Sequence, residues 1–179
     1  MKKLLMILLL VGIGLTGCKP KNPEMKIADM KGYGILSDKF YELTMVESYE
    51  LLTNGTGYIY YGFDKCPWCL ELVPILDEIT KEYDFSIYYV NVRPDGKDIR
   101  SFDDPTYTKV VELTKAFLEL NEEGLPWLWV PQLFAAENGK VTAAHDGTYP
   151  GHDARVNKMN DEERAELKAS LLTFFQLTK

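Results

Sequence analysis

The chain has 179 residues and a formal net charge of −7 at pH 7. This length is enough for one domain with its own hydrophobic core. The acidic balance excludes nucleic acid from the expected partners, because nucleic-acid binding needs a basic face.

The first segment, residues 1–17, has the pattern of a secretory signal. A short basic start at Lys2 and Lys3 precedes an apolar run over residues 4–15. The run is too short for a mature transmembrane helix, which needs about 20 apolar residues. It ends in Leu-Thr-Gly-Cys, which resembles the lipobox of bacterial lipoproteins, where cleavage precedes a cysteine that carries the lipid. An uncleaved anchor or an ordinary signal peptide is the alternative.

The lipobox resemblance implies lipidation of Cys18 and a place in the lipid bilayer of the cell membrane, on its extracytoplasmic face. Several acyl chains hold a protein on a membrane more stably than one chain does. Residues 18–35 start with a Pro-rich and charged stretch, so we expect a lipidated N-terminus and linker there. The folded domain is expected over residues 36–179.

The folded part alternates helical and extended patterns along the chain. A mixed apolar face predicts a first helix over residues 40–52, and aromatic and β-branched residues predict a strand over residues 58–61. Apolar residues at helical spacing then predict a helix over residues 66–83.

The start of this helix carries the sequence Cys-Pro-Trp-Cys over residues 66–69. A Cys-x-x-Cys between a strand and a helix is typical of a redox-active dithiol. The helix N-terminus favours the thiolate of Cys66, so its pKa should fall below the free value of about 8.5. We expect an exposed Cys66 as nucleophile and a shielded Cys69 as the resolving thiol, joined in a redox disulfide. Pro67 fits the first helical turn.

Two other interpretations of the Cys-x-x-Cys pattern remain open. A structural disulfide would close a loop too short to stabilise the chain much. A metal site would need further ligands, and His145 and His152 do not match known zinc spacings. We therefore expect no metal and no cofactor.

The remaining elements complete an α/β pattern. We expect a buried strand over residues 85–92, a helix from Asp104 to Asn121, a hairpin of residues 128–135 and 141–145, and a last helix after Asn160.

These elements resemble the thioredoxin superfamily over most of the chain. The Cys-x-x-Cys helix with Pro74 is similar to the active-site helix of thioredoxins, and the Val130-Pro131 pair is similar to the cis-proline that opens a family strand. The resemblance implies a three-layer α/β/α sandwich with a central mixed β-sheet. It also implies that Pro131 is cis, lies near the dithiol and shapes the substrate contact, while the Val130 backbone pairs with an extended substrate.

The chain departs from the family pattern near the dithiol. Insertions are expected around residues 93–104 and 120–129, and Tyr60 stands where thioredoxins place a buried acid. Trp68 and Pro67, between the cysteines, are predicted to contact substrates, with Trp68 exposed. Trp127 and Trp129 either line a substrate groove or pack in the core.

The sequence therefore predicts a membrane-anchored extracytoplasmic thiol-disulfide oxidoreductase, closer to a reductase or isomerase than to an oxidase. Its expected partners are extracytoplasmic proteins with thiols or disulfides and a membrane redox partner that resets the dithiol. The alternatives are a thioredoxin-fold metallochaperone for copper or zinc, or a non-enzymatic accessory protein of a secretion or bacteriocin system.

Overall fold

The computed structural model describes residues 25–177, and the fold is a mixed six-stranded sheet between two helical layers. The strand order is β1-β2-β4-β3-β5-β6. β2, β4 and β3 pair in parallel, whereas the pairs β1/β2, β3/β5 and β5/β6 are antiparallel. The strands are β1 (Lys26–Ile27), β2 (Phe40–Glu42), β3 (Gly57–Gly62), β4 (Ile87–Asn91), β5 (Gln132–Glu137) and β6 (Lys140–Asp146).

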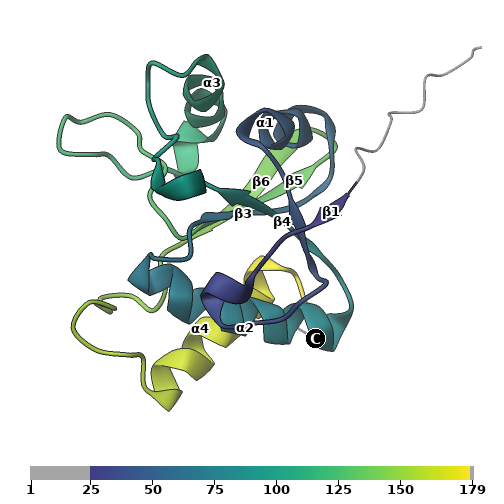
Figure 1. The fold of residues 1–179 in the computed structure, drawn as a ribbon, viewed down its shortest axis with the longest axis vertical. Coiled ribbons are helices and arrows are strands. Elements are labelled where there is room, and N and C mark those ends of the chain that lie inside the picture. Colours follow the sequence, from purple (N-terminus) through teal and green to yellow (C-terminus); the bar gives the residue numbers. More distant parts are fainter. Residues whose placement is uncertain (1–24, 178–179) are drawn as a thin grey trace, which may run out of the picture.

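The α-helices cover both faces of the sheet. Figure 1 shows α1 and α3 on one side and α2 and α4 on the other. This arrangement confirms the predicted thioredoxin-like three-layer α/β/α sandwich. The helices are α1 (Met45–Asn54), α2 (Pro67–Tyr83), α3 (Pro105–Thr114) and α4 (Asp161–Phe174), with short 3-10 turns η1 (Lys31–Tyr33), η2 (Pro94–Gly96) and η3 (Lys115–Phe117).

The central strand β3 supplies side chains to two separate cores, because successive residues of a strand point to opposite faces. Ile59 and Tyr61 lie in the core under α1 and α3, whereas Tyr60 lies in the core under α2 and α4. All three side chains are fully buried. The face to which Tyr60 belongs is the one that carries the Cys-x-x-Cys helix.

The predicted helix over residues 40–52 is wrong at its start. Phe40–Glu42 forms β2, and α1 begins only after Thr44, the N-cap residue. Thr44 and Glu47 form a capping box, in which each side chain accepts a hydrogen bond from the other residue's backbone N–H. This box fixes the helix start, and Phe40 is fully buried in the sheet.

The predicted linker over residues 18–35 is also corrected where the structure describes it. Residues 26–33 contain β1 and η1, and they bury Met30 and Tyr33 against the core. The folded domain therefore begins before residue 36. In the third helical segment, α3 ends at Thr114 instead of continuing to Asn121, with η3 following it.

Candidate dithiol site

The Cys-x-x-Cys motif lies where β3 leads into α2. Cys66 is the N-cap residue of α2, and its sulfur accepts a hydrogen bond from the backbone N–H of Cys69 at 3.3 Å. Pro67 occupies the first helical turn, where its missing N–H costs no intrahelical bond. The sulfur of Cys66 therefore takes the place of the Ser, Thr or Asp oxygen that usually caps a helix.

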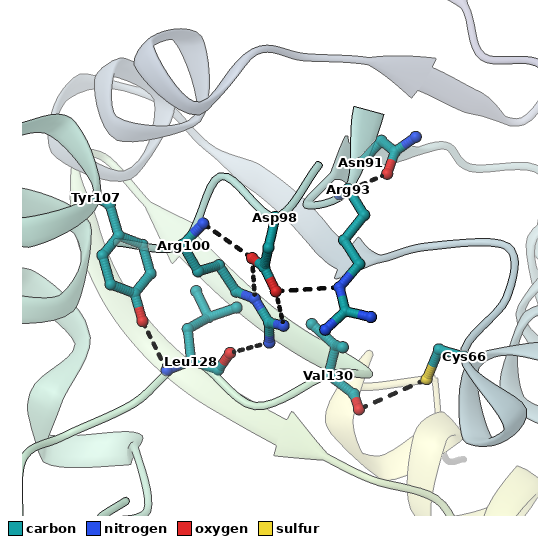
Figure 2. A network of polar contacts seen from close by, with 8 residues as sticks. All are labelled: Cys66, Asn91, Arg93, Asp98, Arg100, Tyr107, Leu128 and Val130. Atoms are coloured by element: carbon teal, nitrogen blue, oxygen red, sulfur yellow. Dashed lines mark hydrogen bonds and ion pairs between the residues drawn. The ribbon is translucent and has the colours of Figure 1, made fainter. Parts of the chain in front are cut away.

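The surroundings of Cys66 favour its thiolate. The pKa of Cys66 is lowered mainly by a hydrogen bond from the thiol of Cys69, and burial opposes this shift. The backbone N–H groups of Cys69 and Trp68 and the positive charge of Arg100 lower the pKa further. On its other side, the thiol of Cys66 lies 3.7 Å from the carbonyl oxygen of Val130 (Figure 2).

The surroundings of Cys69 disfavour a thiolate. Burial raises the pKa of Cys69, and the neighbouring Cys66 raises it further, whereas Tyr60 partly opposes the shift. Behind Cys69 lies a cluster of three tyrosines, with Tyr60 stacked on Tyr89 at 5.5 Å and Tyr33 edge-on to both rings. The two cysteines thus have pKa values shifted in opposite directions.

Solvent exposure does not separate the two cysteines as we expected. Cys66 is 3% exposed and Cys69 is 0% exposed, so the prediction of an exposed attacking thiol is wrong. The backbone carbonyl of Val130 lies against the sulfur of Cys66. The difference between the two thiols lies in their hydrogen bonds and nearby charges.

Tyr60 fills the position where the family resemblance implies a buried acid. Its hydroxyl lies beside the Cys69 thiol, but among the described residues it makes no hydrogen bond of acceptable geometry. Burial raises its pKa well above the usual value. β3 ends in Gly62, where a Cβ atom would collide with this hydroxyl. The site therefore has a neutral phenol where an ionisable carboxyl was implied.

Val130 and Pro131 lie on the other side of Cys66, at the entry to β5. The Val130–Pro131 peptide bond is cis. Pro131 is buried, and its carbonyl accepts a hydrogen bond from the backbone N–H of Gly147 at 2.9 Å. Their roles in substrate contact stay predictions.

Trp68 is half-buried, which corrects the expectation that it is exposed. Its indole Nε1 donates to the carbonyl of His152 at 3.1 Å, and the guanidinium of Arg155 lies 5.2 Å from its ring. The Nε2 atom of His152 and Oε2 of Glu71 lie 3.3 Å apart, although without hydrogen-bond geometry. The segment between β6 and α4 is therefore attached to the first turns of α2.

The two tryptophans before Pro131 differ. Trp127 is half-buried and packs edge-on against Tyr107 and Phe102, whereas Trp129 is 46% exposed. Core packing thus accounts for Trp127, and Trp129 faces solvent.

Two cavities flank the Cys-x-x-Cys turn. One, of about 630 Å³, includes Lys65, Pro67 and Arg93; the other, of about 390 Å³, includes Trp68, Glu119 and Tyr149. The sequence interpretation missed Glu71, Asp98, Arg100 and Tyr33. The spacing Asp-x-Arg at residues 98–100 was the only local signal for any of them.

Other predictions concern residues and groups beyond this site. The signal peptide at residues 1–17 and the lipidation at Cys18 lie outside the described residues. Within residues 25–177, no helix is both long and apolar enough to cross a membrane. In the same part of the chain, no three His, Cys, Asp or Glu residues gather as a metal site would require.

No protein-family model matches the chain, and no curated protein sequence is significantly similar to it. Among solved structures, thioredoxin f2 from Chlamydomonas reinhardtii is 13% identical with a TM-score of 0.41, over 77% of this chain and 97% of that one. Mitochondrial thioredoxin 3 from Saccharomyces cerevisiae is 14% identical with a TM-score of 0.38, over 65% and 87%. Thioredoxin O2 from Arabidopsis thaliana is 18% identical with a TM-score of 0.38, over 66% and 87%. These similarities are too low to carry an argument, and the fold assignment rests on the strand order and the helical layers.

Proposed function

We propose that this protein is a thiol-disulfide oxidoreductase in which Cys66 attacks and Cys69 resolves. The observation that supports this most strongly is the placement of the two thiols: Cys66 is the N-cap residue of α2 and its sulfur accepts a hydrogen bond from the backbone N–H of Cys69, whereas Cys69 lies one turn further in and is fully buried. The pKa directions agree with this placement, lowered for Cys66 and raised for Cys69. A nucleophilic thiol needs its thiolate form near neutral pH. A resolving thiol needs to stay protonated until the first step is complete.

The reaction takes place in two exchanges. The Cys66 thiolate attacks one sulfur of a substrate disulfide, a mixed disulfide forms, and the other substrate sulfur leaves and takes up a proton. Cys69 then loses its proton and attacks the sulfur of Cys66, which releases the second substrate thiol. The substrate gains two electrons, and Cys66 and Cys69 become a disulfide. A dithiol redox partner at the membrane would return the two electrons and close the cycle.

Insulin reduction by dithiothreitol tests the enzymatic proposal. We expect the wild-type protein to accelerate insulin precipitation and Cys66→Ser to be inactive. A wild-type rate equal to the uncatalysed rate would refute the oxidoreductase. Without a histidine between the cysteines, we expect a reduction potential nearer about −270 mV than about −120 mV, hence a reductase or isomerase. A potential above about −150 mV would reverse this direction.

We further propose that the domain is anchored outside the cytoplasm through a lipid on Cys18. The support is the apolar run followed by Leu-Thr-Gly-Cys at residues 15–18. After expression in a bacterial host, the wild type should fractionate with membranes, and Cys18→Ala should carry no lipid. A mature N-terminus at another residue, with Cys18 unmodified by mass spectrometry, would contradict the anchor and leave the oxidoreductase proposal untouched.

A further inference from the structure

A buried arginine connects the loop between β4 and α3 to the segment next to Cys66. The side chain of Arg100 is only 7% exposed. Its Nε and Nη2 atoms donate to the two carboxylate oxygens of Asp98 at 3.0 and 2.7 Å, and its Nη1 donates to the carbonyl of Leu128 at 3.0 Å (Figure 2). A buried guanidinium is costly unless its charge and its donors are matched. Here Asp98 matches the charge, and three of the N–H donors have partners.

The contact with Leu128 connects Arg100 to the backbone next to the sulfur of Cys66. The carbonyl of Leu128 is held by Arg100, and its N–H faces the hydroxyl of Tyr107 at 3.4 Å. Leu128 is fully buried, and Val130 follows two residues later. The carbonyl of Val130 lies 3.7 Å from the sulfur of Cys66. A side chain from the loop between β4 and α3 therefore holds the backbone opposite Cys66 in place.

Asp98 is in turn held by a second arginine. Nε of Arg93 donates to Oδ2 of Asp98 at 3.0 Å, and the guanidinium of Arg93 lies 4.3 Å from the ring of Phe63. Burial opposes ionisation of Asp98, but hydrogen bonds from Arg100 and Arg93 lower its pKa to about 2. Two guanidinium groups and one carboxylate leave a net positive charge, and Arg100 is one cause of the lowered pKa of Cys66.

The same local motif recurs at Asp153 and Arg155, without these consequences. Nε and Nη2 of Arg155 donate to Asp153 at 2.9 and 2.7 Å, as in the first motif. The side chain of Arg155 is 68% exposed, however, and among the described residues its guanidinium holds no backbone carbonyl. The Asp-x-Arg turn alone therefore does not hold another segment in place. That role depends on the burial of Arg100 and on its hydrogen bond to Leu128.

We propose that Arg100 is a positioning residue for the dithiol: through its hydrogen bond to the carbonyl of Leu128 it holds the Val130 segment opposite Cys66. This inference rests on the proposed oxidoreductase function. The role depends on the planar guanidinium, which binds Asp98 and Leu128 at the same time and which an ammonium group cannot replace. The positive charge of Arg100 is a separate matter, and it also lowers the pKa of Cys66.

Two substitutions separate the effects, with alkylation of Cys66 by iodoacetamide measured across pH in a Cys69→Ala background. In Arg100→Gln, we expect the pH of half-maximal alkylation to rise by about 0.5 to 1 unit, with a lower rate below the midpoint. In Arg100→Lys, the charge is retained and the profile should move by less than about 0.3 unit. Arg164→Gln is the control, because it removes an arginine paired with Glu78 on a later turn of α2, and its profile should equal that of the background protein.

Insulin reduction by the same substitutions in the otherwise wild-type protein tests the positioning effect. Arg100→Lys lacks the planar guanidinium that binds Asp98 and Leu128 together. We therefore expect its rate of insulin reduction to fall at least about threefold, even though the positive charge is retained. Wild-type rates in Arg100→Lys would overturn the positioning role, and an unchanged alkylation profile in Arg100→Gln would overturn the charge effect. If Arg100→Gln does not fold, as judged by circular dichroism, Arg100→Lys still tests the positioning effect. A wild type that does not reduce insulin would refute the proposed function, whereas the alkylation profiles would still report on Arg100.

Discussion

The two sides of the Cys-x-x-Cys turn are different chemical environments only three residues apart. On the outer side, Cys66 faces polar groups, namely backbone N–H donors and the carbonyl of Val130, and the positive charge of Arg100 acts on it as well. On the inner side, Cys69 faces aromatic rings, with Tyr60 and its two tyrosine neighbours behind it.

This difference shows that a helix end can separate two identical side chains without a large difference in their solvent exposure. Both cysteines are buried. Hydrogen bonds to its sulfur favour the charged form of Cys66, while desolvation disfavours the charged form of Cys69. The following changes should weaken one side while leaving the other intact.

The largest expected effect comes from removing the ring of Tyr60. Tyr60→Ala would leave a cavity behind Cys69, because the side chain is fully buried, and it should lower the free energy of unfolding by about 3–5 kcal/mol. Tyr60→Phe keeps the ring and removes a hydroxyl without a hydrogen bond, so it should be nearly neutral. Urea unfolding of both variants checks this. A cost below about 1 kcal/mol for Tyr60→Ala would contradict the tight packing of the inner side.

The next effect is a loss of stability of the reduced protein at alkaline pH. Because the pKa of Cys69 is raised in the folded protein, above about pH 8.5 the unfolded chain releases the thiol proton of Cys69, whereas the folded chain keeps it. The free energy of unfolding should therefore fall by about 1.4 kcal/mol per pH unit between about pH 8.5 and 10, before unfolded tyrosines ionise.

The lowered pKa of Cys66 acts at lower pH. Its contribution to stability is complete above about 8.5 and is lost as pH falls through its folded pKa. The control for the alkaline prediction is Cys69→Ala, unfolded at the same pH values between about 8.5 and 10. In this variant the decrease of the free energy of unfolding with pH should disappear. An equal slope in both proteins would assign the effect to another group.

The smallest effect tests the cap on the outer side. Cys66→Ala removes the acceptor for the N–H of Cys69, and it should cost about 1 kcal/mol. Cys66→Ser restores an acceptor at the same place and should recover most of this loss. Equal unfolding free energies for the two variants, measured in reducing buffer, would show that the Cys66 sulfur does not cap α2.

Much of the fold followed from local patterns. The apolar spacing and the early proline of α2, the strand pattern of β3, and the Asn160 cap of α4 are signals carried within a few residues, and all three elements form. The start of α1 was missed although its capping box was in the sequence, because the apolar residues before Thr44 continued the helical pattern.

The surroundings of the dithiol were less predictable, because they depend on contacts between distant segments. Tyr33 lies in residues 18–35, for which the sequence predicts a linker, yet it packs against Tyr60 and Tyr89. Arg100 meets the carbonyl of Leu128, 28 residues later. Neither contact leaves a local pattern, whereas Cys66, Cys69 and Pro131 could be singled out by spacing and resemblance alone.

Mixed-disulfide trapping tests the division of roles between the cysteines most directly. Reduced Cys69→Ser and Cys66→Ser are incubated with insulin, and covalent adducts are measured by mass spectrometry after acid quenching. We predict that Cys69→Ser accumulates an adduct on Cys66, because nothing resolves it, whereas Cys66→Ser forms almost none. Equal adduct formation by the two variants, or a larger amount on Cys69, would contradict the assignment of Cys66 as nucleophile and Cys69 as resolving thiol.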